Sequence, residues 1–270
     1  NEGLLVWYRV MMASGFFLLY LFITHGKIRI GVRDAIRIAW VGFLLSLHWL
    51  CFYGSIKYSN VSIGVVCFAS ISFFTAILDP LMSKRRFSLR EIAFSLLTIF
   101  GIGLIFHFDT QHQAGIILGV LGALLGSVMT IENRRVGVDY PLMTFLFYEI
   151  LSSFVIMSAI LPIYLHFFPV ESIVPGVADI VYLLLLSSVC TVGMFSLQLE
   201  ALKKLSTFTV NLSFNLEPVY SIVIAMVLFN EAKEINFSFY LGLLLIIVSV
   251  LLQTYFHGKT YQKLPKKASA

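Results

Sequence analysis

Charged residues are scarce in this chain of 270 residues. Lysine and arginine number 19 and aspartate and glutamate 14, so 12% of the residues are charged, against roughly 25% in soluble domains. Hydrophobic residues make up 59% of the chain. An ordinary soluble domain is therefore excluded, and the composition predicts a protein that lies within a lipid bilayer.

Cysteine and enzyme motifs are scarce as well. The three cysteines, Cys51, Cys67 and Cys190, lie within apolar runs, which argues against a disulfide scaffold and against a zinc cluster. Neither HExxH, GxSxG nor a GxxxxGK[ST] loop occurs, so a membrane protease, a serine hydrolase and a primary pump are disfavoured. We expect no enzyme activity, no cofactor and no metal.

Long apolar runs dominate what is present. Crossing a bilayer takes about 20 apolar residues in a helix, and these runs are too long and too continuous for barrel strands of about 10 residues. They predict an all-α, polytopic membrane helix bundle. The nine predicted spans are 4–24, 36–54, 61–82, 92–108, 115–133, 141–163, 178–198, 207–229 and 237–256.

The basic residues alternate between the connections of these spans. All lysines and arginines except Arg9, Lys57 and Lys233 fall on one side, together with the basic tail 259–270. Such clusters are typical of a membrane protein rather than of a nucleic-acid-binding protein, and the positive-inside rule makes the tail cytoplasmic. Nine spans then put Asn1 outside without a signal peptide. We expect a preceding tenth span and a bacterial inner (plasma) membrane location.

The chain also repeats itself. The segment from Gly54 matches the segment from Glu200 in pattern at a constant offset of 146, and Ser72 then meets Pro218. Two repeats of five spans each must enter the membrane in opposite orientations, as in secondary transporters that bind substrate at the midplane. We predict repeats over 1–110 and 111–258, with nine of the ten helices present.

Three segments resemble a known family. FNLEPVYSIVIAMVLFNE (214–231) resembles the signature of the second EamA repeat in the drug/metabolite transporter superfamily, GSIKYSNVS (54–62) resembles its first-repeat counterpart, and LLVWYRVMMASGFFLLYLF (4–22) resembles the second helix. The chain lacks the proline that this family commonly has near Ser72 and the glutamate near Arg85. The resemblance implies a ten-helix carrier, often an exporter of amino acids or other small metabolites.

Glu217 is the first candidate for a substrate or coupling site. It lies about ten residues, or roughly 15 Å at 1.5 Å per residue, inside its span, and Pro218 beside it frees a backbone carbonyl. Either Glu217 binds substrate or a proton at a hinge, or it is a protonated residue that caps the broken helix. Asn211 and Asn215 either extend this polar stripe or join neighbouring helices.

Two further pairs lie in corresponding spans of the two repeats. Arg9 follows Tyr8 in the first span, and Glu149 follows Tyr148 in the sixth. Ionisable groups at membrane depth cost about 2.5 to 3.5 kcal/mol on insertion scales. An Arg9–Glu149 charge pair across the repeat interface is therefore one prediction, and an Arg9 side chain that extends outward to the interface is the other.

The second span contains the densest polar and aromatic group, His48, Trp49 and Tyr53. A hydrated His48 would titrate near neutral pH, whereas a packed histidine would be part of the core. Because His48 and Trp49 are adjacent, we do not expect both to face one cavity fully. Aromatic faces at this place would suit an apolar or zwitterionic metabolite.

The fifth span carries two GxxxG units, formed by Gly115, Gly119, Gly122 and Gly126. Such spacing lets helices approach closely, and we expect a helix of the same repeat as its partner, with a homodimer contact as the alternative. The chain is predicted to act as a monomer whose partners are the bilayer and a small-molecule substrate. Transport by alternating access is the favoured function, and a membrane receptor without transport is the alternative.

Overall fold

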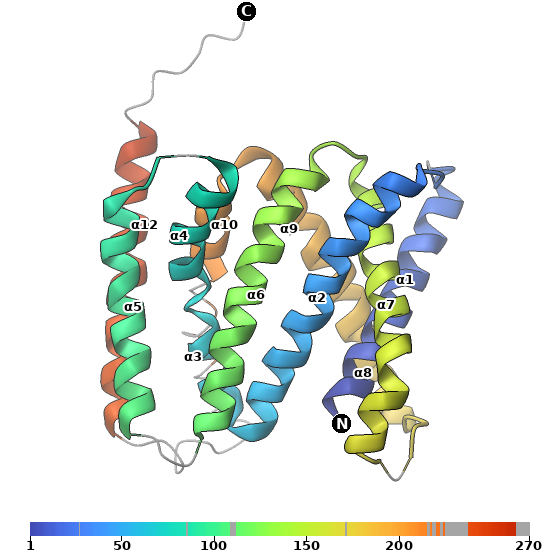
Figure 1. Ribbon diagram of the computed structural model, residues 1–270, viewed down its shortest axis with the longest axis horizontal. Helices are drawn as coiled ribbons and strands as arrows, with labels where there is room; N and C mark the ends of the chain where they lie inside the picture. Colours follow the sequence, from blue (N-terminus) through green and yellow to red (C-terminus); the bar gives the residue numbers. More distant parts are fainter. Residues whose placement is uncertain are drawn as a thin grey trace, which may run out of the picture.

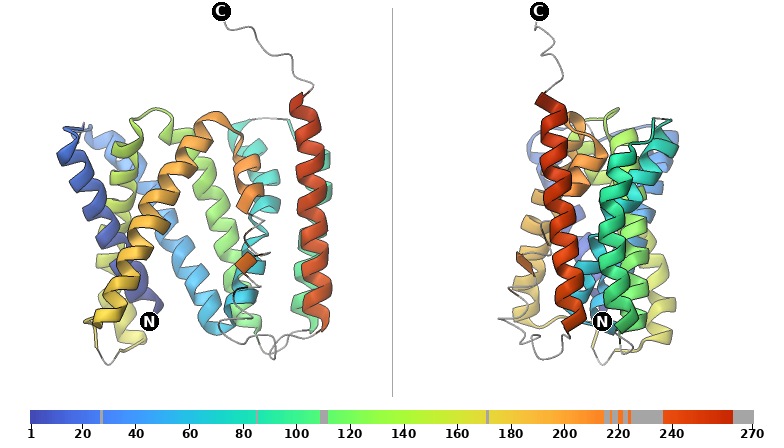
Figure 2. Two further views of the ribbon diagram at one scale, coloured as in Figure 1. Left: turned by 180° about the vertical axis from the view of Figure 1, so that it is seen from behind. Right: turned by 90° about the vertical axis from the view of Figure 1, so that its left-hand side faces the viewer.

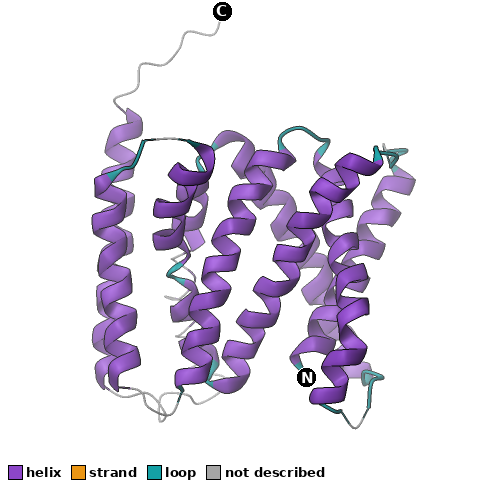
Figure 3. Cartoon of the chain, viewed as in Figure 1, coloured by secondary structure: helices purple, strands orange, loops and turns teal. Residues whose placement is uncertain are grey.

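The computed structural model describes residues 1–26, 28–84, 86–108, 112–170, 172–214 and 237–262, together with 217, 220–221 and 224. Within these residues the chain forms helices and turns and no strand (Figure 3). The helices stand side by side in one bundle (Figure 1). The predicted all-α fold is confirmed.

The helices follow the predicted spans closely. In chain order they are α1 (Glu2–Ile23), α2 (Val32–Tyr58), α3 (Val61–Phe68), α4 (Ile71–Ser83), α5 (Leu89–Phe108), α6 (Gln113–Gly137), α7 (Leu142–Phe167), α8 (Val177–Ser187), the π-helix η1 (Ser188–Gly193), α9 (Met194–Lys204), α10 (Thr207–Phe214) and α12 (Phe237–Gln262). In the described part of the chain, 6 helical segments are long and apolar enough to cross a membrane, with 61–83 and 177–204 each counted as one.

The helix bounds reproduce the internal repeat. Adding 146 to the bounds of α2, 32–58, gives 178–204, and the α8–η1–α9 segment spans 177–204. Adding 146 to the first residue of α3, 61, gives 207, the first residue of α10. The offset found in the sequence is therefore an offset of structure at the starts of these helices.

Equivalent helices of the two repeats pack against each other. Helix α1 contacts α7, and α5 contacts α12; the pair α5 and α12 stands side by side in the right view of Figure 2. Helix α4, the second half of the span 61–83, contacts α10 of the equivalent span in the other repeat. This is the contact pattern expected of inverted repeats related by a pseudo-two-fold axis in the membrane plane. The predicted two-repeat plan is confirmed.

The glycine face of α6 packs within the chain, but not where we predicted. A Cβ on Gly119 would lie 2.6 Å from the Cβ of Cys67, and one on Gly122 would lie 3.3 Å from the amide nitrogen of Phe52. Cys67 is in α3 and Phe52 in α2, so the partners belong to the first repeat, whereas α6 opens the second. The expectation of a partner in the same repeat was wrong, because small residues permit a close approach without selecting the neighbour.

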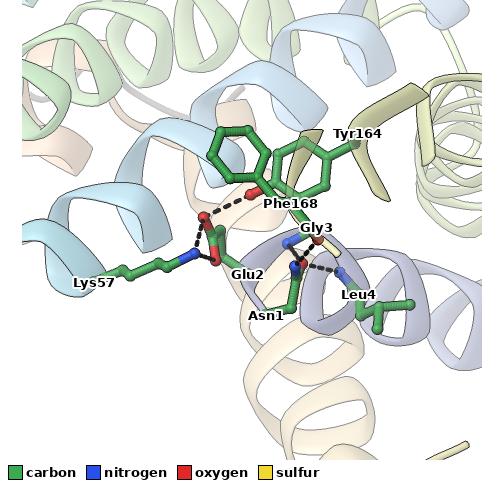
Figure 4. A network of polar contacts seen from close by, with 7 residues as sticks. All are labelled: Asn1, Glu2, Gly3, Leu4, Lys57, Tyr164 and Phe168. Carbon is green, nitrogen blue, oxygen red and sulfur yellow. Dashed lines mark hydrogen bonds and ion pairs between the residues drawn. The ribbon is translucent and has the colours of Figure 1, made fainter. Parts of the chain in front are cut away.

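A polar network joins helices of the two repeats at one end of the bundle (Figure 4). The Glu2 carboxylate accepts a hydrogen bond from the Tyr164 hydroxyl at 2.5 Å and forms an ion pair with Lys57 Nζ at 2.9 Å. The Asn1 side chain donates to the Phe168 carbonyl at 3.0 Å. These contacts join α1 and α2 of the first repeat to α7 and the residue that follows it in the second.

The opposite end carries a second set of polar contacts between the repeats. Arg37 Nη1 of α2 lies 3.2 Å from the Asp139 carboxylate in the turn after α6. The Tyr140 hydroxyl donates to the Asp34 carboxylate at 2.8 Å, and this hydrogen bond raises the pKa of Tyr140. Both side chains of the Arg37–Asp139 pair are about half exposed, so this pair contributes little stability, typically under about 1 kcal/mol.

The crossing of α2 and α7 gives a test of the packing. A Cβ on Gly42 would collide with the Ser152 hydroxyl and the Glu149 carbonyl, and such overpacking typically costs about 1 to 3 kcal/mol. We expect Gly42→Ala to lower the thermal midpoint of the purified protein in detergent. Gly15→Ala in α1 is the control, because a Cβ there meets nothing within 4 Å. Equal midpoints for the two variants would contradict the close crossing.

Candidate functional site

A cavity of about 130 Å³ lies in the middle of the bundle. Its lining comes from both repeats and from the middle of the contributing helices, which places it near mid-depth. The first repeat contributes Arg9, His48, Trp49, Phe52, Phe68 and Ile71, and the second contributes Gly126, Met129, Thr130, Met194, Phe195, Gln198, Phe214 and Glu217. Most of this lining is apolar or aromatic, with one guanidinium and one carboxyl group.

Arg9 is the best-anchored polar side chain of the cavity. It is 7% exposed, and its Nε donates to Thr191 Oγ1 at 2.7 Å. Nη1 donates to the Tyr53 hydroxyl at 2.8 Å, and Nη2 donates to the Cys190 carbonyl at 3.1 Å. The guanidinium carbon lies 3.8 Å from the ring centroid of Trp49, within the range of a cation–π interaction.

The π-helix η1 explains how Arg9 finds two of these acceptors. A π-turn interrupts the regular α-helical ladder, and such turns are frequent at functional sites. Thr191 Oγ1 donates to the Leu186 carbonyl at 2.9 Å, five residues earlier, which holds the hydroxyl oxygen in place for Arg9. The Cys190 carbonyl next to it accepts from the same guanidinium. The widened turn therefore presents a hydroxyl and a carbonyl side by side.

The charge pair predicted between Arg9 and Glu149 is not formed. Every described hydrogen-bond acceptor of Arg9 is neutral, and no ion pair in the described part of the chain includes Arg9. The alternative prediction, an outward-extended side chain, is also wrong, because Arg9 is buried over Trp49. Matching positions in the two repeats did not make the two side chains face each other.

Glu149 lies outside the cavity, in the contact of α7 with α2 and α6. It is fully buried, and neither carboxyl oxygen has a hydrogen-bond partner of good geometry, although the Asn133 side chain lies beside it. Burying an ionised carboxylate without a partner is very costly. The site therefore favours the neutral acid.

The two tyrosines that precede Arg9 and Glu149 donate hydrogen bonds to backbone carbonyls in the loops between helices. The Tyr148 hydroxyl donates to the Ile28 carbonyl at 2.9 Å, and the Tyr8 hydroxyl donates to the Ile173 carbonyl at 3.1 Å. Neither tyrosine lines the cavity. Tyr53, by contrast, reaches it indirectly as a partner of Arg9.

His48 and Trp49 both line the cavity. His48 Nδ1 lies 2.7 Å from the Gly122 carbonyl and its ring lies 5.5 Å from that of Phe68. Trp49 packs edge-on against Phe195 at 5.7 Å. Neighbours on a helix point in different directions, and the two side chains accordingly have different contacts. His48 is also buried and hydrogen-bonded, as a packed histidine would be.

The predicted polar stripe around Glu217 is described only in part. Glu217 itself is half-buried and lines the cavity. Asn211 Nδ2 donates to Thr75 Oγ1 at 2.7 Å, and Thr75 shares a hydrogen bond with Ser127 at 2.9 Å, so Asn211 joins α10 to α4 and α6. Asn215 and Pro218 lie outside the described residues.

Two polar residues of the cavity were not identified from the sequence. Gln198 and Thr130 both line the cavity within otherwise apolar spans. Gln198 follows Thr191 by seven residues, close to two helical turns, and this spacing was the available signal. Thr130 gave a weaker signal, because a threonine in a membrane helix usually bonds its own backbone, as its hydroxyl does here to the Gly126 carbonyl at 2.8 Å.

The anchoring of Arg9 gives a second test. Thr191→Val keeps the side-chain shape but removes the acceptor of Arg9 Nε, and leaving a buried donor unsatisfied costs about 1 to 3 kcal/mol. We expect a lower thermal midpoint. Ser187→Ala is the control, because the Ser187 hydroxyl donates only to backbone carbonyls of its own helix. A midpoint for Thr191→Val as high as that of the control would show that the hydroxyl does not anchor Arg9.

Glu149 gives a third test. If the buried side chain is neutral, Glu149→Gln replaces it with a neutral group of the same size, and the stability should stay within about 1 kcal/mol of wild type. Glu149→Lys introduces a charge that cannot be buried there and should abolish the folded protein. Thermal unfolding and size-exclusion profiles measure both. A large loss for Glu149→Gln would mean that an ionised carboxylate is required.

Comparisons with known proteins agree with this geometry. The chain matches the sequence profile of the EamA-like transporter family over residues 3–107 and 113–255. A solved structure, described only as a crystal structure of a protein, superposes with a TM-score of 0.69 at 13% identity, covering 94% of this chain and 88% of that one; at this identity the likeness shows the fold alone. No curated protein matches significantly. This integral membrane protein belongs to the EamA-like transporter family.

Proposed function

We propose that the protein is a secondary transporter that exports amino acids or similar small metabolites by alternating access. The observation that carries this proposal is the cavity at mid-depth, whose lining is divided between the two inverted repeats. Carriers of this plan hold substrate between their repeats and expose it to one side at a time as the repeats move. A receptor without transport has no comparable support, because the family is one of transporters.

The mixed chemistry of the cavity supports amino acids as the substrate class. The lining includes one guanidinium group, of Arg9, and one carboxyl group, of Glu217, without an ion pair between them. Aromatic rings form much of the remaining wall. A small zwitterion with an apolar side chain would satisfy all three kinds of surface, whereas a purely apolar solute would leave two charged groups without partners.

The polar contacts at the two ends of the bundle are suited to act as alternating gates. Lys57 and Tyr164 contact Glu2 at one end, and Arg37 contacts Asp139 at the other. Both sets join the first repeat to the second. A few hydrogen bonds of about 1 kcal/mol each are weak enough to break and reform as the repeats rock.

The orientation follows from the distribution of basic residues. The helix ends next to Arg29, Arg86, Arg135 and Lys204 lie at the same end of the bundle as the last residues of α12 (Figure 1). By the positive-inside rule this end is cytoplasmic. We propose the inner (plasma) membrane of a bacterium as the location, with substrate entering the cavity from the cytoplasm.

A transport screen of amino acids and related metabolites in proteoliposomes tests the substrate class. We expect at least one small amino acid with an apolar side chain to be transported down its gradient. The alternating-access mechanism predicts in addition that unlabelled substrate on one side accelerates efflux of labelled substrate from the other. If no amino acid in the screen is transported, the proposed substrate class is wrong.

Glu217→Gln tests the cavity within the same assay. We expect a loss of transport of at least about tenfold, because the variant removes the only acidic side chain among the described lining residues, while the thermal midpoint stays close to wild type. Glu200→Gln is the matched control, since Glu200 is exposed and pairs with Lys204 one turn away on the surface. Wild-type flux from Glu217→Gln, with and without a pH gradient, would remove Glu217 from the site.

A further inference from the structure

The Arg9 guanidinium is a buried positive charge without a neutralising partner in the described part of the chain. Its three hydrogen-bond acceptors, on Tyr53, Cys190 and Thr191, are neutral oxygens, and its remaining contact is the face of Trp49. Buried charges are normally paired or coordinate an ion, because desolvation is costly. Arg9 lines the central cavity, from which a counter-ion can approach the charge.

Arg9 also has donors to spare. A guanidinium carries five N–H groups, and the three hydrogen bonds use one each on Nε, Nη1 and Nη2. One N–H therefore remains on each terminal nitrogen, and no described residue accepts a hydrogen bond from either of these two groups. A carboxylate, which has two acceptor oxygens, is the group best suited to pair with such a guanidinium.

The surroundings hold the guanidinium in a fixed orientation. Thr191 and Cys190 of the π-helical turn and Tyr53 of α2 accept its hydrogen bonds. The ring of Trp49 lies against the guanidinium carbon. A lysine at position 9 would keep the charge but lose the planar fork and the stacking on Trp49. The arrangement is that of a preorganised receptor for a planar oxyanion.

We infer that Arg9 is the receptor for the carboxylate of the transported molecule. The substrate class is then a small carboxylate whose apolar or aromatic body lies against the Phe52, Phe68 and Phe195 walls. This inference rests on the proposed function, because it assigns an orientation to the same cargo. An amino acid would place its carboxylate at Arg9 and its ammonium group toward Glu217.

A series of three ligands separates the role of the carboxylate from that of the rest of the molecule. L-phenylalanine carries both charges, L-phenylalaninamide lacks the carboxylate, and 3-phenylpropionate lacks the ammonium group. Binding to the purified protein is measured by calorimetry, and transport by competition with labelled L-phenylalanine in proteoliposomes. For the wild-type protein we expect the amide to bind at least about tenfold more weakly than the amino acid, as expected for loss of a hydrogen-bonded charge.

The variant Arg9→Lys adds a second, independent comparison. We expect it to weaken L-phenylalanine binding by at least about tenfold and to leave the binding of L-phenylalaninamide unchanged, so that the preference for the carboxylate disappears. Arg135→Gln is the matched control, since Arg135 is about half exposed and pairs with Glu132 on its own helix at the end of the bundle; its ligand preferences should equal those of wild type.

The possible outcomes distinguish this inference from the proposed function. Transport of L-phenylalanine with equal affinity for the amide would overturn the role of Arg9 and leave the transporter in place. An equal loss of both ligands in Arg9→Lys would do the same, because it would show a structural role only. Absence of binding and transport for every ligand of the series would overturn the inference, whereas the proposed function falls only if the whole amino-acid screen is negative as well. The wild-type comparison decides the question even if Arg9→Lys does not fold.

Discussion

The buried guanidinium of Arg9 is the interaction on which the centre of this structure depends. It connects α1 to α2 through Tyr53 and to η1 through Thr191 and Cys190, and so it joins the two repeats at mid-depth. Because its hydrogen-bond partners are neutral, the positive charge remains available to pair with an anion. A bundle that only needed a cross-link would be served equally well by a neutral hydrogen-bonding residue, without the cost of burying a cation.

The inverted repeats account for the position of this charge. Equivalent helices pack against each other, and the cavity lies where residues from both repeats meet. The most extensive helix contact, between α2 and α6, is also a contact between the repeats, and glycines on α6 bring the two backbones close together. Helix α2 therefore both forms this contact and carries His48 and Trp49 into the cavity.

Much of the fold could be predicted from the sequence, because apolar length and the repeat are local or periodic signals. The offset of 146 places the start of α10 at its observed residue, Thr207, and Arg9 and Glu217 are recognisable as costly ionisable residues in apolar runs. The contact partners of these residues, by contrast, could not be predicted from such signals. Arg9 contacts Thr191, 182 positions away in the sequence, at a π-helical turn. Neither this turn nor the placement of Glu149 away from Arg9 produces a periodic pattern in the sequence. The glycines of α6 likewise predict close packing but not the neighbour.

A structure of the protein with a bound amino acid tests the central claim, that Arg9 receives the carboxylate of the cargo, most directly. The account predicts that the ligand occupies the cavity between the repeats, with its carboxylate oxygens within hydrogen-bond distance of Arg9 Nη1 and Nη2 and its ammonium group toward Glu217. The contacts of Arg9 with Thr191 and the Cys190 carbonyl should persist. A ligand bound elsewhere or in the reverse orientation, or an Arg9 that has moved to pair with Glu217, would contradict it.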